Sequence, residues 1–250
     1  MNTTIPRLRM FAGPNGSGKS TFKSDLSPEW LGVYLNPDEI EQTINGRGVL
    51  DLSEFSVEAL PQEVLSFFGE SAFLANSGFG SDVGKLRFSD NRLSFAGMQV
   101  NSYYASVAVD FIRQKLLVGG VSFTFETVMS HESKVQLLCE AQKKGYRTYL
   151  YYIATDDPAI NISRVKSRVA DGGHSVPLEK IEPRYYRSLD LLAEAIRHTN
   201  RAYIFDNSIE SRERTWIAEI TEGQQLEVKT AVVPAWFKKA VLDKFGVATD

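Results

Sequence analysis

Residues 7–21 read RLRMFAGPNGSGKST and are the most informative part of the sequence. Its first half is an apolar run of strand length, and its second half matches the spacing G-x-x-x-x-G-K-[ST]. Polyphosphate oxygens are bound by consecutive backbone N–H groups, and side chains at the glycines would block that approach. With a strand before it and a helix after it, the stretch predicts a phosphate-binding P-loop.

The motif assigns a role to each of its positions. Lys19 is predicted to reach the β- and γ-phosphates, and the Ser20 hydroxyl is predicted to bind Mg²⁺. The dinucleotide motif G-x-G-x-x-G is excluded, because no third glycine follows Gly18 at the required spacing. The motif therefore predicts a nucleotide with Mg²⁺, whose phosphates are bound by Gly13, Pro14, Asn15, Gly16, Ser17, Gly18, Lys19, Ser20 and Thr21.

Composition narrows the class of partner. The chain has 250 residues, a net charge of -3 and a pI near 5.8, so it carries no broad basic field for a nucleic acid or an anionic membrane surface. Cys139 is the only cysteine, which excludes a disulfide framework and fits a reducing compartment. The sequence shows no secretory signal and no run long enough to span a bilayer, so we expect a cytoplasmic protein.

Strand-like runs alternate with helical patterns along most of the chain. The expected strands are residues 7–12, 31–36, 120–126, 147–154 and 201–206. This alternation predicts an α/β fold: a P-loop NTPase-type three-layer sandwich with a mostly parallel sheet, as a single domain over 1–250. A C-terminal hairpin around residues 222–225 and a closing helix over 234–246 complete it.

Residues 46–101 interrupt the alternation and are predicted to be an insertion. Within it, residues 85–95 alternate with period two on both sides of Ser89-Asp90-Asn91, which predicts a hairpin. Its place after the second strand suggests a substrate cap.

Carboxylates follow two of the predicted strands. Asp38, after residues 31–36, can accept a proton from an attacking substrate hydroxyl, or it simply favours a helix start after Pro37. Glu126 ends the third strand and can order Mg²⁺ or hold a substrate hydroxyl, or it is an ordinary strand-end acid. Thr127 and His131 are expected to face the substrate, although His131 can equally be an exposed helix-start residue.

Arginines gather on two helices around Gly172-Gly173. Arg164 and Arg168 share one helix face, and Arg184 and Arg187 belong to the next helix. The cluster predicts a helical lid that brings guanidinium groups onto the transferred phosphoryl group; the alternative is a solvated charged helix pair. Asp206 and Asn207, after the last strand, either shape the nucleotide edge or serve a turn.

These motifs, in order, resemble the zeta-toxin-like P-loop kinases. The resemblance rests on GPNGSGKST, NPDEI, FETVMS, GYRTYLYYIA, RVADGGHSVP, RYYRSL and FDNS, and covers most of residues 6–210 apart from the insertion. It implies an ATP- and Mg²⁺-dependent kinase whose described relatives phosphorylate the 3′-hydroxyl of UDP-N-acetylglucosamine and are held off by an antitoxin.

The resemblance also implies residue roles. Asp38 matches the catalytic base, Glu126 and Thr127 match the start of the substrate motif, and Arg168 matches a lid arginine. The sequence departs from the family at Val128-Met129-Ser130, where a sugar-nucleotide-binding arginine is absent, and at His174, which stands near the place of a second lid arginine.

The sequence therefore predicts a phosphotransferase that moves the γ-phosphate of ATP to a small-molecule hydroxyl, such as that of a UDP-sugar. Catalysis is assigned to Lys19, Asp38, Arg164 and Arg168, acceptor binding to Asp38, Glu126 and Thr127, and metal binding to Ser20 and Glu126. Two alternatives stay open: an NTP hydrolase or switch that regulates a partner, and a nucleic-acid 5′-hydroxyl kinase, which the acidic balance disfavours.

Overall fold

A computed structural model describes residues 5–23, 26–173, 176–209 and 213–246. The chain divides into two compact units, one formed by residues 1–31 with 124–250 and the other by residues 32–123. The second unit contains the predicted insertion and begins earlier in the chain, at Gly32. The single-domain organisation stays a prediction.

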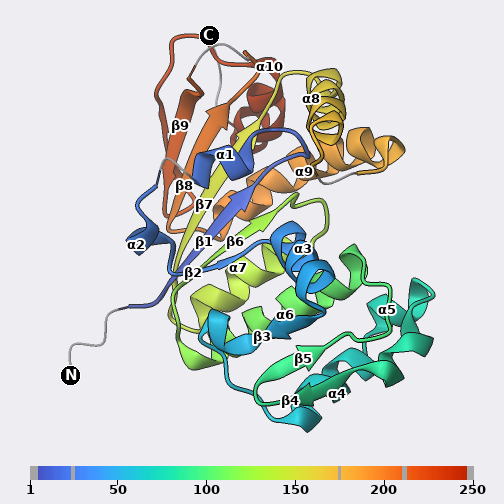
Figure 1. The fold of residues 1–250 in the computed structure, drawn as a ribbon. Helices are drawn as coiled ribbons and strands as arrows, with labels where there is room; N and C mark the ends of the chain where they lie inside the picture. The colour runs from blue at the N-terminus through green and yellow to red at the C-terminus, as the bar shows by residue number, and fades with distance from the viewer. Residues whose placement is uncertain (1–4, 24–25, 174–175, 210–212, 247–250) are drawn as a thin grey trace. The chain divides into compact units, whose positions relative to one another are not determined.

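The first unit is built on a sheet whose strand order is β10-β9-β8-β7-β1-β6. Its strands are β1 (Arg7–Ala12), β6 (Phe123–Thr127), β7 (Arg147–Ala154), β8 (Arg201–Asp206), β9 (Thr215–Thr221) and β10 (Gln225–Val228). The pairs β1–β7 and β7–β8 are parallel, whereas β9 runs antiparallel to both β8 and β10. This arrangement confirms the mostly parallel α/β class and the predicted C-terminal hairpin (Figure 1).

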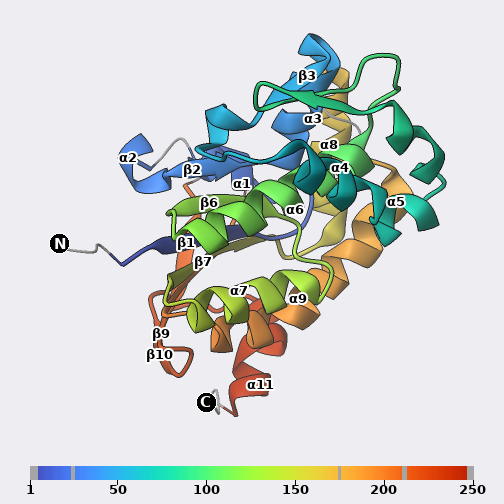
Figure 2. The ribbon, with the colours of Figure 1, turned by 90° about the horizontal axis from the view of Figure 1, so that it is seen from below.

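Helices cover both faces of this sheet, which makes three layers. They are α1 (Lys19–Lys23), α2 (Pro28–Leu31), α7 (Ser133–Lys143), α8 (Pro158–Ala170) and α9 (Ile181–Arg197), with a 3₁₀ turn at Leu178–Lys180. Figure 2 shows α7 and α9 on one side of the sheet and α1 on the other. The buried face of α9 includes Ile181, Tyr185 and Leu192, and β1 is buried along five of its six residues.

The C-terminal segment differs from the expected single helix. It consists of α10 (Ala235–Phe237), a π-helical turn over Lys238–Leu242 and α11 (Asp243–Phe245). Pro234 begins it as predicted, and Trp236, Phe237 and Val241 are buried. None of the helices in the described residues is long and apolar enough to cross a membrane.

The second unit combines helices with a small antiparallel sheet of order β3-β5-β4. Its elements are β2 (Val33–Leu35), α3 (Pro37–Arg47), β3 (Val49–Asp51), α4 (Pro61–Gly69), α5 (Ala72–Asn76), β4 (Arg87–Ser89), β5 (Arg92–Ser94) and α6 (Ser102–Gly119), with 3₁₀ turns at Leu52–Phe55 and Gly80–Lys85. β4 and β5 form the predicted hairpin, with Asp90 and Asn91 both at positive φ, as a tight two-residue turn requires. Its pairing with β3 was not predicted.

Candidate active site

The P-loop joins β1 to α1 in the first unit. Ser17 N–H donates to the carbonyl of Pro14 across the turn, 3.3 Å away, and Gly16 takes a φ of 74°. A Cβ at Gly16 would lie 2.6 Å from the backbone oxygen of Asn161, so this position requires glycine for space as well as for conformation.

Lys19 stands at the start of α1 and lies over the loop. Its ammonium group donates to the carbonyls of Gly13 and Pro14, at 2.8 and 2.9 Å, and its side chain is largely buried. Contacts with both of these carbonyls keep the charge next to the loop that the motif assigns to phosphates.

Ser20 and Glu126 meet although they are 106 residues apart. The Ser20 hydroxyl donates to Oε1 of Glu126 at 2.9 Å, and Glu126, on β6, is 9% exposed. A hydroxyl and a carboxylate supply the hard oxygen ligands that Mg²⁺ prefers. The described residues hold no cluster of three or more His, Cys, Asp or Glu, and Mg²⁺ at a phosphate site needs none, because phosphates and waters complete its shell. The pair therefore fits the predicted metal.

Two carboxamides from outside the motif hold the loop. Asn161, on α8 and fully buried, donates through Nδ2 to the carbonyl of Asn15 at 2.6 Å. Asn207, directly after β8, donates through Nδ2 to the carbonyl of Ser17 at 2.8 Å, and its own N–H donates to Ala154 at 2.8 Å. The loop's shape thus depends on residues that follow β7 and β8.

Sequence reasoning missed Asn161 and left Asn207 open between a site and a turn. The available signal was their position: both lie at the carboxyl edge of the parallel sheet, where ligands of α/β folds bind. The side chain of Asp206, in contrast, has a structural role. Its Oδ2 accepts from the indole N–H of Trp236 at 2.8 Å and from the hydroxyl of Ser208 at 2.9 Å.

The lid arginines lie on a helix that is tied to this network. Arg164 Nη1 donates to the carbonyl of Asn207 at 2.7 Å, which connects α8 to the loop's support. Arg168, one turn further, accepts at its carbonyl from the N–H of Gly173 at 2.8 Å. Their action on a phosphoryl group stays a prediction, and His174 lies outside the described residues.

Helix α9, which carries Arg184 and Arg187, is anchored to the sheet. The Tyr185 hydroxyl donates to the carbonyl of Thr155 at 2.6 Å, and the Ser188 hydroxyl donates to Val128 at 2.7 Å. Burial raises the pKa of Tyr185 above its ordinary value, so this hydroxyl keeps its proton and remains a donor. Movement of this helix away from these loops would require breaking both hydrogen bonds.

The remaining predicted residues have local partners. Thr127 accepts at Oγ1 from the N–H of Met129, 3.1 Å away, so its hydroxyl oxygen holds the turn after β6. His131 Nδ1 lies 3.0 Å from the Ser133 hydroxyl and 3.2 Å from its N–H, as in the helix-start alternative. Asp38, in the second unit, lies in the first turn of α3, where its N–H donates to Asn36 Oδ1 at 2.9 Å. That geometry fits a helix start, and the catalytic role of Asp38 stays a prediction.

Comparison with known proteins finds one family model that matches part of the chain. The family model described as Zeta toxin matches residues 97–216, a little under half of the chain, including Glu126, Arg164 and Arg168. This match agrees with the predicted resemblance to the zeta-toxin-like P-loop kinases over these residues.

The chain is also similar to a Haemophilus influenzae protein and to two structures of one complex, AvrRxo1-ORF1 with ORF2. An uncharacterized protein of Haemophilus influenzae is 32% identical over 65 residues, which are 26% of this chain and 46% of that protein. The structure of AvrRxo1-ORF1:AvrRxo1-ORF2 with sulphate ions aligns with 92% of this chain and 62% of that one, at 13% identity and a TM-score of 0.54. The complex with ATP aligns with all of this chain and 67% of that one, at 14% identity and a TM-score of 0.54.

These similarities support the fold. The chain spans less than half of the Haemophilus protein and about three fifths of the sulphate-bound AvrRxo1-ORF1 structure.

Proposed function

We propose that this chain is an ATP-dependent phosphotransferase that moves the γ-phosphoryl group to a hydroxyl of a small molecule. The observation that carries the proposal is the meeting of Lys19, Ser20 and Glu126 around a glycine loop in one compact unit. A lysine, a hydroxyl and a buried carboxylate in this arrangement supply charge neutralisation and metal ligation, which are the main requirements of phosphoryl transfer.

The transfer forms a bond from the acceptor oxygen to phosphorus and breaks the bond from phosphorus to the β-phosphate oxygen, leaving ADP. Lys19 neutralises charge on the phosphates, Ser20 and Glu126 would hold Mg²⁺, and Arg164 and Arg168 face the charge that develops. Mg²⁺, when bound, offsets the negative charge of the β- and γ-phosphates. Asp38 accepts the proton that leaves the acceptor hydroxyl, and Thr127 helps to bind the acceptor.

The proposed acceptor is a UDP-sugar, with UDP-N-acetylglucosamine as the first compound to test, and the proposed partner is a small antitoxin protein. The match of residues 97–216 to the Zeta toxin family model supports both. The similar AvrRxo1-ORF1 structures are complexes with ORF2, one of them with ATP, which makes ATP and a protein partner the first ligands to assay.

The test is ADP formation by the full chain in Mg²⁺ and ATP, with and without sugar nucleotides, nucleosides and oligonucleotides. We expect turnover to depend on an acceptor that gains the mass of one phosphoryl group. Lys19→Ala should lower turnover by about a hundredfold to a thousandfold, and Lys143→Ala, an exposed lysine on α7, should not. ADP formation at the same rate without any acceptor would support the hydrolase alternative and contradict the proposal.

A further inference from the structure

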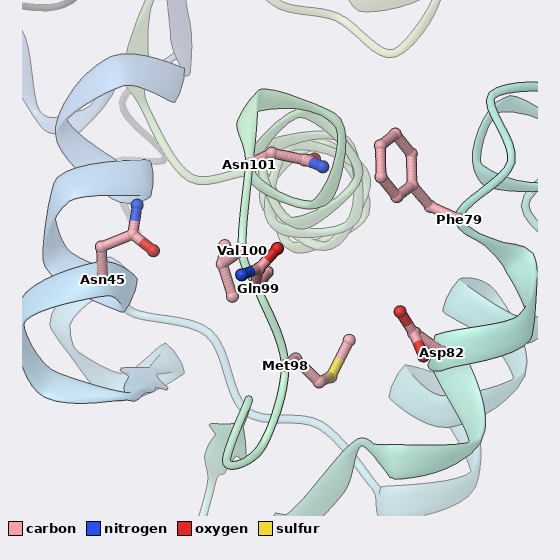
Figure 3. A pocket seen from close by; sticks show the side chains of 7 residues that line it. All are labelled: Asn45, Phe79, Asp82, Met98, Gln99, Val100 and Asn101. Atoms are coloured by element: carbon pink, nitrogen blue, oxygen red, sulfur yellow. The ribbon is translucent and has the colours of Figure 1, made fainter.

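The second unit contains a pocket of about 520 Å³, which lies within the usual range of small-molecule sites. Figure 3 shows its walls: the last turn of α3 with Asn45, the turn that carries Phe79 and Asp82, and the extended segment 98–101 before α6. All of these residues belong to one unit, so the pocket exists within a single compact body.

One wall is a fixed aromatic ring. The ring of Phe79 lies 5.1 Å from that of Tyr103 and 5.8 Å from that of Tyr104, measured between centroids. The Tyr104 hydroxyl donates to the carbonyl of Phe79 at 3.0 Å, and Tyr104 is 1% exposed. Because backbone and ring are both held, Phe79 presents a preformed apolar surface to a ligand.

The other walls are polar. The side chains of Asn45 and Gln99 are exposed and make no hydrogen bond with another described residue. Asn101 accepts from the N–H of Tyr103 through Oδ1, at 3.0 Å, which leaves its amide N–H groups for the pocket. One carboxylate oxygen of Asp82 forms an ion pair with the ammonium of Lys85 at 2.6 Å, and the second oxygen is left to accept from a ligand. Three carboxamides and a carboxylate therefore offer both donors and acceptors.

The charge of the lining selects the ligand class. None of the described residues that line the pocket is Lys or Arg, and its one ionisable lining side chain is the carboxylate of Asp82. A phosphate group would meet no lining cation, since the nearby ammonium of Lys85 is already paired with Asp82, and it would face that carboxylate. Hydroxyl groups, in contrast, can donate to Asp82 and exchange hydrogen bonds with the carboxamides, while C–H groups pack on Phe79.

We propose that this pocket binds an uncharged, polyhydroxylated ring, such as a monosaccharide without phosphate. The proposal goes beyond phosphotransfer and does not depend on it, because it uses only residues of the second unit. Its test therefore contains no nucleotide, and it can fail while the kinase proposal stands, or succeed while the kinase proposal fails.

The full chain is titrated with glucose, N-acetylglucosamine, glucosamine and glucose 6-phosphate, and binding is followed by saturation-transfer NMR. A ring of about a dozen heavy atoms with ordinary contacts should bind with a Kd on the order of millimolar. We expect saturable binding of the two neutral sugars and weaker binding of the phosphorylated one.

Variants locate the binding to the pocket. Asn45→Ala and Gln99→Ala each remove one set of hydrogen bonds and should weaken neutral-sugar binding by about threefold to tenfold. Gln42→Ala, on the same helix as Asn45, and Gln114→Ala, on α6, are exposed controls that should bind as the wild type does. Gln99→Lys supplies the missing cation and should shift preference toward glucose 6-phosphate.

Three results would overturn the proposal. The first is the absence of saturable binding of neutral sugars to wild-type protein with a native circular dichroism spectrum. The second is equal affinity in the Asn45 and Gln99 variants and in their controls. The third is glucose 6-phosphate binding at least as tightly as glucose to the wild type.

Discussion

Replacing Asn207 with alanine tests whether a residue outside the motif sets the shape of the P-loop. The substitution removes the 2.8 Å hydrogen bond from Nδ2 to the carbonyl of Ser17, a residue that is fully buried. An unpaired buried acceptor costs about 1–3 kcal/mol. The backbone contacts of residue 207 with Ala154 and Arg164 do not involve its side chain and should remain.

The free-energy cost of the unpaired carbonyl should appear either in the melting temperature or in the Kd for Mg·ATP. If the loop stays in place, the protein loses stability, and the melting temperature falls by roughly 2–4 °C for each kcal/mol in a chain of this size. If the loop relaxes instead, part of the binding free energy is needed to restore its shape. The Kd for Mg·ATP then rises by about fivefold to 150-fold. The two effects together should account for about 1–3 kcal/mol.

Calorimetric titration with Mg·ATP and thermal unfolding by circular dichroism measure the two parts. Asn207→Asp keeps the side-chain shape but places a carboxylate oxygen against the Ser17 carbonyl, so it should weaken binding more than alanine does. Asn76→Ala, at an exposed position of α5, is the matched control. If Asn207→Ala matches the wild type within twofold in Kd and within a degree in melting temperature, the inference that Asn207 shapes the loop is refuted.

Three further predictions concern the base, the metal pair and acid stability. Asp38→Asn should slow single-turnover transfer by about a hundredfold to ten-thousandfold with little change in the Kd for ATP; an unchanged rate would leave Asp38 only its helix-start role. Ser20→Ala removes one proposed metal ligand, so the Mg²⁺ concentration that gives half-maximal turnover should rise, whereas an unaltered Mg²⁺ titration would contradict ligation by this hydroxyl. The Ser53 hydroxyl and a neighbouring arginine lower the pKa of Asp51 from 3.8 to about 2, so the stability that this carboxylate contributes is complete above pH 3.8 and is lost as the pH falls toward 2. Melting curves between pH 5 and 2 should therefore show a shallower acid decline in Asp51→Asn, and identical slopes in both proteins would argue against this contribution.

Local sequence was sufficient for most of the secondary structure. Helix α6 begins after the Asn101 cap and ends at Gly119, and the next residue, Gly120, takes a φ of 64°. The β4–β5 hairpin follows from Asp90-Asn91, two residues that tolerate positive φ. These signals lie within a few residues of the structure that they specify, so no knowledge of distant neighbours was needed.

Strand boundaries and the pairing of distant strands were harder to predict from the sequence. The strand expected at 31–36 is only Val33–Leu35, and the strand expected at 120–126 is Phe123–Thr127. The pairing of β3 with β5 joins segments more than 40 residues apart in the sequence and has no local signature in three residues. Short strands exist because a neighbour completes their hydrogen bonds, which a linear pattern does not reveal.

Residue spacing alone specifies the phosphate loop, because glycine, lysine and serine at fixed positions act through their own backbone and the helix that follows them. It also specifies the alternation of strands and helices, and hence the α/β class. The folded chain, in contrast, is needed to show that Ser20 contacts Glu126 and that Asn161 and Asn207 bind the loop's carbonyls. Each of those contacts joins residues more than 100 positions apart, and such distances close only when strands pair in a definite order and bring their carboxyl ends to one edge of the sheet.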